Sequence, residues 1–286
     1  MNENPEQKCY SCGGGDFEII HRGTRDNANL DVLKCKNCGL LFLSDDSHID
    51  STFYEQGGML GGKFNLQNWI NNTFEDDKRR FLMLKKDLKN KVLTDFGCGN
   101  AGFLNLAKNT AKKVYGVELQ KDLYEYFDKC NLEVYADIAA IPEKSDIITM
   151  FHVLEHIKNP VQILKNLKPH LNQGGKIIIE VPNSKDALIR LYNCKSFQDF
   201  VYWSCHIYVY NEKTLKKIVQ DAGYKIEKFR QIQRYSLMNH LFWLFKHKSG
   251  GHKKWAKFDL KPLNWVYSFI LKLFKMTDTL MIEISK

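Results

Sequence analysis

The sequence predicts an α/β fold built around a parallel sheet with helices on its faces. Strand and helix signals alternate between residues 91 and 230, and the first strand signal leads directly into a glycine-rich loop that opens a helix. Two Cys-x-x-Cys pairs before residue 40 predict an additional small module. We therefore expect a cysteine module over 1–45, a helical bridge or lid over 46–90 and a main domain over 91–286.

Composition supports a folded protein and excludes several classes. Of the 286 residues, 44% are hydrophobic and 26% are charged, which is enough apolar material for a sizeable core. The most apolar stretch, 262–271, is shorter than the ~20 residues that a membrane span needs. The polar start, 1–8, lacks the apolar run of a signal peptide, so we expect a cytoplasmic, reducing compartment.

The formal net charge of +9 is concentrated in the last fifth of the chain. Such a positive field attracts anions of any kind. Nucleic acid, an anionic membrane surface and a phosphorylated small molecule all remain open as partners. Charge alone does not choose among them.

The N-terminal module contains four cysteines in two matched pairs, Cys9 with Cys12 and Cys35 with Cys38. Four thiolates at this spacing are typical of a tetrahedral zinc site, and a full shell of protein ligands indicates a structural ion. The strand signals at 17–20 and 32–33 predict a hairpin between the pairs. We therefore interpret 1–45 as a zinc ribbon. Buried cysteines without metal and a redox dithiol are the alternatives.

The main domain opens with five strands, of which the first is followed by the glycine loop and a helix over 103–107. The predicted strands are Lys91–Phe96, Lys113–Val117, Val134–Tyr135, Asp146–Phe151 and Lys176–Val181. Each is short and apolar, as expected of strands buried on both faces of a parallel sheet.

The loop after the first strand has the form G-x-G-x-x-G, and Glu118 follows Gly97 at the distance expected for an acid that binds ribose hydroxyls. That pattern fits either NAD or S-adenosylmethionine. Asp95, at the end of the first strand, would repel a pyrophosphate but would suit a cationic ligand. The residues therefore favour S-adenosylmethionine, which carries an ammonium and a sulfonium and no phosphate.

Four motifs then carry a family resemblance: 95–99 (DFGCG), 116–118 (GVE), 137–138 (DI) and 152–157 (HVLEHI) with Pro160. In order and spacing they resemble class I S-adenosylmethionine-dependent methyltransferases, over roughly 91–229. The closest group is that of small-molecule enzymes similar to ubiquinone-biosynthesis and sugar methyltransferases, some of which carry an N-terminal four-cysteine zinc module. The resemblance implies a Rossmann-like seven-stranded sheet, completed by a sixth strand at 225–230 and an antiparallel seventh at 279–284.

The resemblance also implies the cofactor residues. Asp95 and Gly97 would hold the methionine part, Glu118 the ribose, and Asp137 with Ile138 the adenine edge. Gly99 and Phe151 are expected in the same site.

A helical insertion is expected at about 237–276, before the last strand. Its apolar stripe, Val266, Phe269, Ile270 and Leu273, has helical spacing. Packing of this stripe on the domain is the first expectation. A basic amphipathic surface for peripheral membrane contact and a cap over the acceptor are the alternatives.

Methyl transfer to a hydroxyl needs a base, and histidine is the natural candidate. His206 resembles the acceptor-side histidine of deoxysugar methyltransferases and is our first candidate, followed by His152. His156 belongs to a motif shared by enzymes with different acceptors, which indicates a structural role.

The leading hypothesis is therefore a methyltransferase that acts on a small-molecule acceptor, a sugar hydroxyl of a nucleotide-linked or lipid-linked glycan precursor. An RNA methyltransferase is an alternative because a zinc ribbon beside a basic domain suits RNA. The few cations of the cysteine module, Arg22, Arg25, Lys34 and Lys36, argue against nucleic acid as a partner. A zinc-bearing interaction protein without activity and an NAD-dependent oxidoreductase complete the alternatives. The sequence leaves the oligomeric state open.

Overall fold

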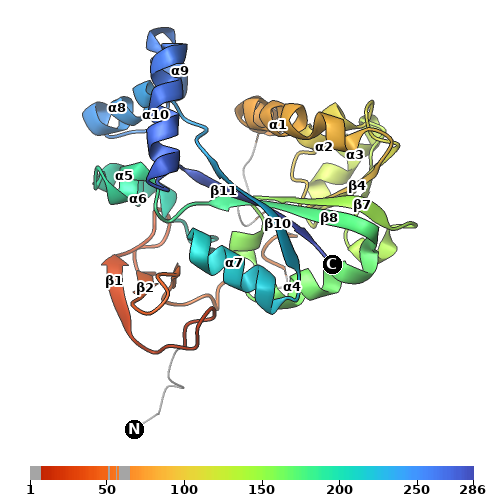
Figure 1. Cartoon of the computed structure of the whole chain (residues 1–286), viewed down its shortest axis with the longest axis horizontal. Coiled ribbons are helices and arrows are strands. Elements are labelled where there is room, and N and C mark those ends of the chain that lie inside the picture. Colours follow the sequence, from red (N-terminus) through yellow and green to blue (C-terminus); the bar gives the residue numbers. More distant parts are fainter. Residues whose placement is uncertain (1–7, 51, 56, 58–64) are drawn as a thin grey trace.

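The computed structural model describes residues 8–50, 52–55, 57 and 65–286, and its centre is a seven-stranded sheet (Figure 1). The strands lie in the order β10-β11-β8-β7-β4-β5-β6. Their bounds are β4 Val92–Phe96, β5 Lys113–Val117, β6 Glu133–Tyr135, β7 Ser145–Phe151, β8 Leu171–Pro182, β10 Lys225–Ile232 and β11 Thr279–Ser285. Strands β4 to β8 pair in parallel, whereas β11 is antiparallel to both neighbours. The predicted Rossmann-like α/β sheet is confirmed.

Two strands run further than the sequence predicted. β8 begins at Leu171 because Leu171 pairs with Ser145 ahead of an irregularity in the ladder with β7. β10 continues to Ile232 because its ladder with β11 continues to Thr279. In both cases the extra length depends on a partner strand that is distant in sequence.

Helices cover both faces of the large sheet (Figure 1). On one face lie α1 Leu66–Leu88, α2 Gly102–Ala107 and α3 Tyr124–Lys129, and on the other lie α4 Pro160–Leu167 and α7 Glu212–Asp221. Each face has its own apolar core: Leu84, Leu104 and Phe127 belong to the first, and Leu164 and Leu215 to the second. The parallel strands are thus buried on both sides, which explains their continuous apolar sequences.

The cysteine module forms a second sheet with a strand from the main domain. β1 Phe17–His21, β2 Val32–Cys35 and β3 Leu41–Leu43 are followed in the sheet by β9 Tyr208–Val209. The side chain of Asn211 also donates a hydrogen bond of 2.9 Å to the carbonyl of Gly39. The module's sheet is therefore completed by residues 208–209, and the expected division of the chain at residue 45 stays a prediction.

The insertion projects from one end of the large sheet (Figure 1). It consists of α8 Leu237–Lys246, α9 Gly251–Lys254 and α10 Lys261–Leu273, and it packs near α5 Ala187–Arg190 and α6 Lys195–Val201. Trp243 of α8 is buried and meets the rings of Phe197 and Phe200 at centroid distances of 5.3 Å each.

The expectation that the apolar stripe of α10 packs on the domain is wrong. Val266, Phe269, Ile270 and Leu273 are all exposed. The inward side of α10 is instead built around Leu271, which is buried. No helix of the described residues is both long enough and apolar enough to cross a membrane.

Candidate active site

A cavity of about 860 Å³ lies at the carboxyl ends of the parallel strands. Loops after β4 to β8 line it, together with residues of α1 and α6. This edge is where open α/β sheets bind their ligands, because the strand connections diverge there. Tyr54 and Trp69 of the expected bridge also line the cavity, and a lid function for 46–90, part of which lies outside the described residues, stays a prediction.

The glycine loop after β4 forms one end of the cavity. Gly97 and Gly99 have φ angles of 73° and 53°, which other residues adopt only with strain. A Cβ atom on Gly97 would lie 2.6 Å from a methyl group of Val153. Position 97 therefore requires glycine for two reasons: its φ angle is positive, and a Cβ atom would clash with Val153.

Glu118 supplies the negative charge of this loop. Its Oε2 accepts a hydrogen bond of 2.8 Å from the backbone N–H of Gly99, and its Oε1 accepts bonds from Leu119 and Gln120. A pyrophosphate at this loop would lie against the Glu118 carboxylate, because that carboxylate already accepts hydrogen bonds from the backbone N–H groups that a phosphate would need. The loop thus fits a ribose and a cationic group, in agreement with S-adenosylmethionine.

Asp95 lies behind the loop. Its carboxylate is buried, accepts a hydrogen bond of 2.7 Å from Thr149, and is not among the described residues that line the cavity. Burial raises the pKa of Asp95 to about 7. Glu118, and not Asp95, therefore places a carboxylate at the cavity surface beside the loop. The expected direct contact of Asp95 with the cofactor stays a prediction.

The remaining predicted cofactor residues line the same cavity. Asp137 accepts a hydrogen bond of 2.9 Å from the N–H of Ala139, which fixes the short turn that contains Ile138. Phe151 lies at the end of β7, edge-on to Phe103 at 5.0 Å. Asp137 and Ile138 follow β6 and Phe151 ends β7, so the cavity brings them together across two intervening strands, and their role in nucleoside binding stays a prediction.

His152 directly follows β7 and has a φ of 56°, a conformation that is uncommon outside glycine. Its Nδ1 lies 3.1 Å from Oε1 of Glu155, and its Nε2 lies 3.4 Å from Nη1 of Arg234. Burial works against a charged imidazole, but the hydrogen bonds to Glu155 and Glu180 outweigh it and raise the pKa of His152. A base oriented by a carboxylate is the arrangement used for proton transfer.

His206 and His156 lie on the same wall in a different environment. Their ring centroids are 5.0 Å apart, and Nδ1 of His156 bonds the carbonyl of Cys205 at 2.8 Å. Within the described part of the chain, the buried Nδ1 of His206 has no hydrogen-bond partner. Burial lowers the pKa of His156 and brings that of His206 to about 3. Both rings are therefore neutral near pH 7.

Residues 67–228 match the family model of a methyltransferase domain. The chain belongs to this family and is an S-adenosylmethionine-dependent methyltransferase. The assignment excludes the NAD-dependent oxidoreductase and agrees with the geometry of the glycine loop.

Relatives of the methyltransferase differ in their acceptors. A tRNA U34 carboxymethyltransferase of Campylobacter hominis is 34% identical over 140 residues, 41% of this chain and 49% of that protein. The chain thus spans about half the length of the first curated relatives that it matches. A ubiquinone biosynthesis O-methyltransferase of Hydrogenovibrio crunogenus is 21% identical over 88% of this chain and 94% of its own.

Among solved structures, magnesium protoporphyrin IX methyltransferase from Synechocystis, with bound S-adenosylhomocysteine, has a TM-score of 0.51. It is 14% identical, and the match covers 84% of this chain and 99% of that chain. At this identity the likeness concerns the fold alone.

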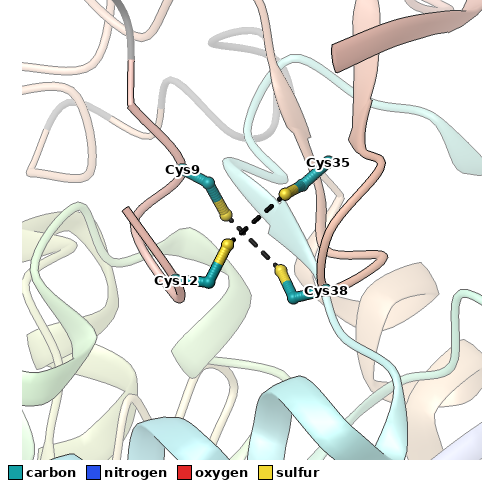
Figure 2. Close-up of side chains that lie close together, drawn as sticks. All are labelled: Cys9, Cys12, Cys35 and Cys38. Atoms are coloured by element: carbon teal, nitrogen blue, oxygen red, sulfur yellow. Dashed lines mark hydrogen bonds between the residues drawn. The ribbon is translucent and has the colours of Figure 1, made fainter. Parts of the chain in front are cut away.

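The cysteines of the methyltransferase converge as predicted (Figure 2). Sγ of Cys9 lies 3.5 Å from that of Cys38, and Cys12 and Cys35 are separated by the same distance. All four sulfur atoms lie within 4.8 Å of one another. Tetrahedral zinc with bonds of about 2.3 Å places its ligands ~3.8 Å apart, so the four donors fit a zinc ion.

Sequence analysis missed a buried ionic layer on the floor of the cavity. Arg80 of α1 bonds Glu180 of β8 at 2.7 Å, and Nη1 of Arg234 lies 3.1 Å from Asp76. Burial opposes ionisation of Glu180, but the arginines and His152 hold its pKa well below the usual range. One signal was available: Glu180 is a charged residue inside the otherwise apolar run 177–182. The residues that contact Glu180 form no sequence motif with it, because they come from segments that are distant in the chain.

Proposed function

We propose that this methyltransferase transfers a methyl group to a hydroxyl of a small-molecule acceptor held in the cavity, with His152 as the base. The observation that carries the proposal is the contact between Nδ1 of His152 and Glu155 at the cavity wall. The geometry thereby favours His152 over His206 as the base. The lower pKa of His206 makes its neutral imidazole a weak proton acceptor.

S-adenosylmethionine supplies, when bound, an electrophilic methyl group on a sulfonium. We assign its binding to Gly97, Gly99 and Glu118 at one end and to Asp137, Ile138 and Phe151 at the other, with Asp95 supporting the loop. The chain's own residues must then orient the acceptor and remove its proton.

The proton path follows from the tautomer of His152. When Nδ1–H donates to Glu155, the neutral ring has its lone pair on Nε2. Nε2, which lies 3.4 Å from Nη1 of Arg234, would then receive the proton of the acceptor hydroxyl. Glu155 is buried and stabilises the imidazolium that forms.

The rest of the cavity provides enclosure. Phe197 and Phe200 of α6 line it on the acceptor side, and Arg234 with Asp186 provides polar contacts. Exclusion of water favours methyl transfer, because the positive charge of the donor disappears in the transition state. The relatives described above are named for tRNA and ubiquinone substrates, so the proposal is a small hydroxyl acceptor in general, of which the expected sugar is one member.

RNA is the second candidate acceptor. Several relatives are named tRNA U34 carboxymethyltransferases, and the chain has a net charge of +9. Phosphate contacts by lysines would give binding that falls steeply with salt. Transfer to tRNA with such a salt dependence would favour this candidate over the small acceptor.

The test uses labelled S-adenosylmethionine with two acceptor panels. One contains small hydroxyl compounds (quinols, nucleotide sugars and lipid-linked sugars), and the other contains total tRNA. We expect label in the first panel and a loss of about 10²-fold or more in kcat for His152→Asn. Binding of S-adenosylhomocysteine should not change.

The matched control is His247→Asn. His247 has a similar φ of 52°, which asparagine also tolerates, and it lies at the end of α8. Full activity of His152→Asn, or label in tRNA alone, would contradict the proposal.

A further inference from the structure

The surface of the insertion carries a dense group of exposed apolar side chains. We call it the insertion patch and define it as Phe245, Phe258, Leu260, Leu263, Trp265, Val266, Phe269, Ile270, Leu273 and Phe274. Trp265 is 71% exposed and Leu273 is 67% exposed. Soluble surfaces carry scattered apolar residues, whereas a contiguous group of this size marks an interaction site.

Helix α10 is oriented with its apolar side outward. Its inward contacts are polar: Asn264 accepts a hydrogen bond from the N–H of Leu237, and Tyr267 contacts His240 at 2.7 Å. Only Leu271 supplies a buried apolar anchor. Trp265 and Phe269 stack on the outer side with centroids 6.0 Å apart. The helix is therefore held in place by polar contacts while its apolar face lacks cover within the described chain.

Lysines are interspersed in sequence with the residues of the insertion patch. Residues 245–275 contain eight lysines and one acidic residue, Asp259. All eight are exposed: Lys246, Lys248, Lys253, Lys254, Lys257, Lys261, Lys272 and Lys275. On α10, Lys261 and Lys272 are eleven residues apart, which is three turns, so they lie on the same side of the helix. The insertion thus combines an exposed apolar face on α10 with exposed lysines, two of which lie on one side of that helix.

We propose that the insertion patch docks on the surface of an anionic lipid bilayer. Aromatic and aliphatic side chains enter the boundary between head groups and acyl chains, while lysines contact anionic head groups. Charge selects this occupant: two copies of the patch facing each other would bring two sets of lysines together, which disfavours self-association. Nucleic acid would match the lysines but would leave the aliphatic face uncovered.

The packing of α8 links this surface to the cavity. Trp243 of α8 is buried against Phe197 and Phe200, and both phenylalanines line the cavity. Because α8 also contacts α10 through His240 and Tyr267, it joins the insertion to the cavity wall. The docking proposal itself stands on the surface and does not require the acceptor proposal.

The experiment is co-sedimentation of the full chain with vesicles. One set is pure phosphatidylcholine, and the other contains about one third phosphatidylglycerol. We expect at least tenfold stronger binding to the anionic set at ~0.1 M NaCl, and weaker binding at ~0.5 M because salt screens the lysines. The double variant Trp265→Ala/Phe269→Ala should bind at least tenfold less, with an unchanged melting temperature.

The matched control is Leu82→Ala/Ile19→Ala. Both of these residues are exposed apolar side chains, 61% and 48% exposed, and lie outside the insertion. This control should bind vesicles like the native chain. A second variant, Lys254→Glu/Lys257→Glu/Lys261→Glu, should lose the preference for anionic vesicles.

Four outcomes would overturn the proposal. The native chain binds neither vesicle set, or Trp265→Ala/Phe269→Ala binds as well as the native chain. The third is a concentration-dependent dimer in analytical ultracentrifugation that this variant abolishes, which would assign the patch to a second copy. Binding of tRNA in place of vesicles, lost in the lysine variant alone, would also contradict lipid docking.

Discussion

Two nitrogens of Arg80 contact the same oxygen of Glu180, Nη2 at 2.7 Å and Nε at 3.0 Å. Arg80 belongs to α1 and Glu180 to β8, so this pair joins the bridge segment to the centre of the sheet. Both side chains are buried. The contact holds α1 against the cavity floor, where Asp76 also meets Arg234.

Substitution of Arg80 tests this connection. Arg80→Met leaves Glu180 buried with fewer cationic partners, and we expect a loss of about 3 kcal/mol in the free energy of unfolding. Urea denaturation measures it. The control is Arg22→Met, which removes an exposed ion pair with Asp31 and should cost less than about 1 kcal/mol. If the two variants had the same free energy of unfolding, the buried pair of Arg80 and Glu180 would make no special contribution to stability.

Gly97 of the glycine loop can be compared with Gly174 of β8, because both have the same backbone φ angle. Gly97 and Gly174 both have a φ of 73°, but a Cβ on Gly97 would meet Val153 at 2.6 Å and one on Gly174 would meet no atom within 4 Å. Gly97→Ala should therefore lower the affinity for S-adenosylhomocysteine at least tenfold in calorimetry. Gly174→Ala should lose only about 1 kcal/mol of stability and keep its affinity. Unchanged affinity in Gly97→Ala would remove the loop from the cofactor site.

If the four cysteines bind zinc, the stability of the module should depend on the metal. We expect about one zinc ion per chain by atomic absorption, its loss in Cys35→Ser, and a lower melting temperature after chelation. Because β9 completes the module's sheet, the loss should also loosen the neighbouring segment that carries His206. Cys130→Ser, outside the cluster, is the control. A metal-free native chain that is as stable as the loaded one would refute the zinc assignment.

The pair of His152 and Glu155 predicts the pH dependence of transfer. The raised pKa of His152 keeps the ring protonated until the pH exceeds its ordinary value of 6.5, and only the neutral ring accepts a proton. The rate should therefore rise with pH through a pKa above 6.5. Glu155→Gln removes the stabilising carboxylate, so this pKa should fall, the profile should shift to lower pH and kcat should drop.

Glu125→Gln serves as the control for the pH profile. Glu125 is an exposed residue of α3 that pairs with Lys129. Its substitution should leave the profile in place. A native profile that is flat between pH 5 and 9, or one that Glu155→Gln does not move, would separate His152 from the proton transfer.

The buried ionic layer of Arg80 and Glu180 gives stability a pH dependence in the same direction as that of the rate. The pKa of Glu180 is held well below its ordinary value, so its ionised form stabilises the fold above the unfolded pKa of about 4.3. That contribution is lost as the pH falls toward the folded pKa.

The sequence by itself determined the order of strands along the chain, the glycine loop, Glu118 and the four cysteines. Each of these depends on residues that are near one another in sequence: apolar runs, turns that require glycine, and two short cysteine spacings. The four cysteines converge because the hairpin between the two pairs is a local structure. The lengths of β8 and β10 were less well predicted, because a strand ends where its partner ends.

Only the tertiary structure decided the chemistry of the cavity and the character of the insertion. Glu155 is three residues from His152, yet its orienting role depends on the left-handed turn that brings Oε1 to the ring. Arg80 meets Glu180, and Arg234 meets Asp76, across a hundred residues or more, in pairs that no local pattern encodes. The stripe of α10 was read correctly as one helical face, but periodicity cannot say which way a face points. That direction was set by Asn264, Tyr267 and Leu271, whose contacts turn the apolar face outward.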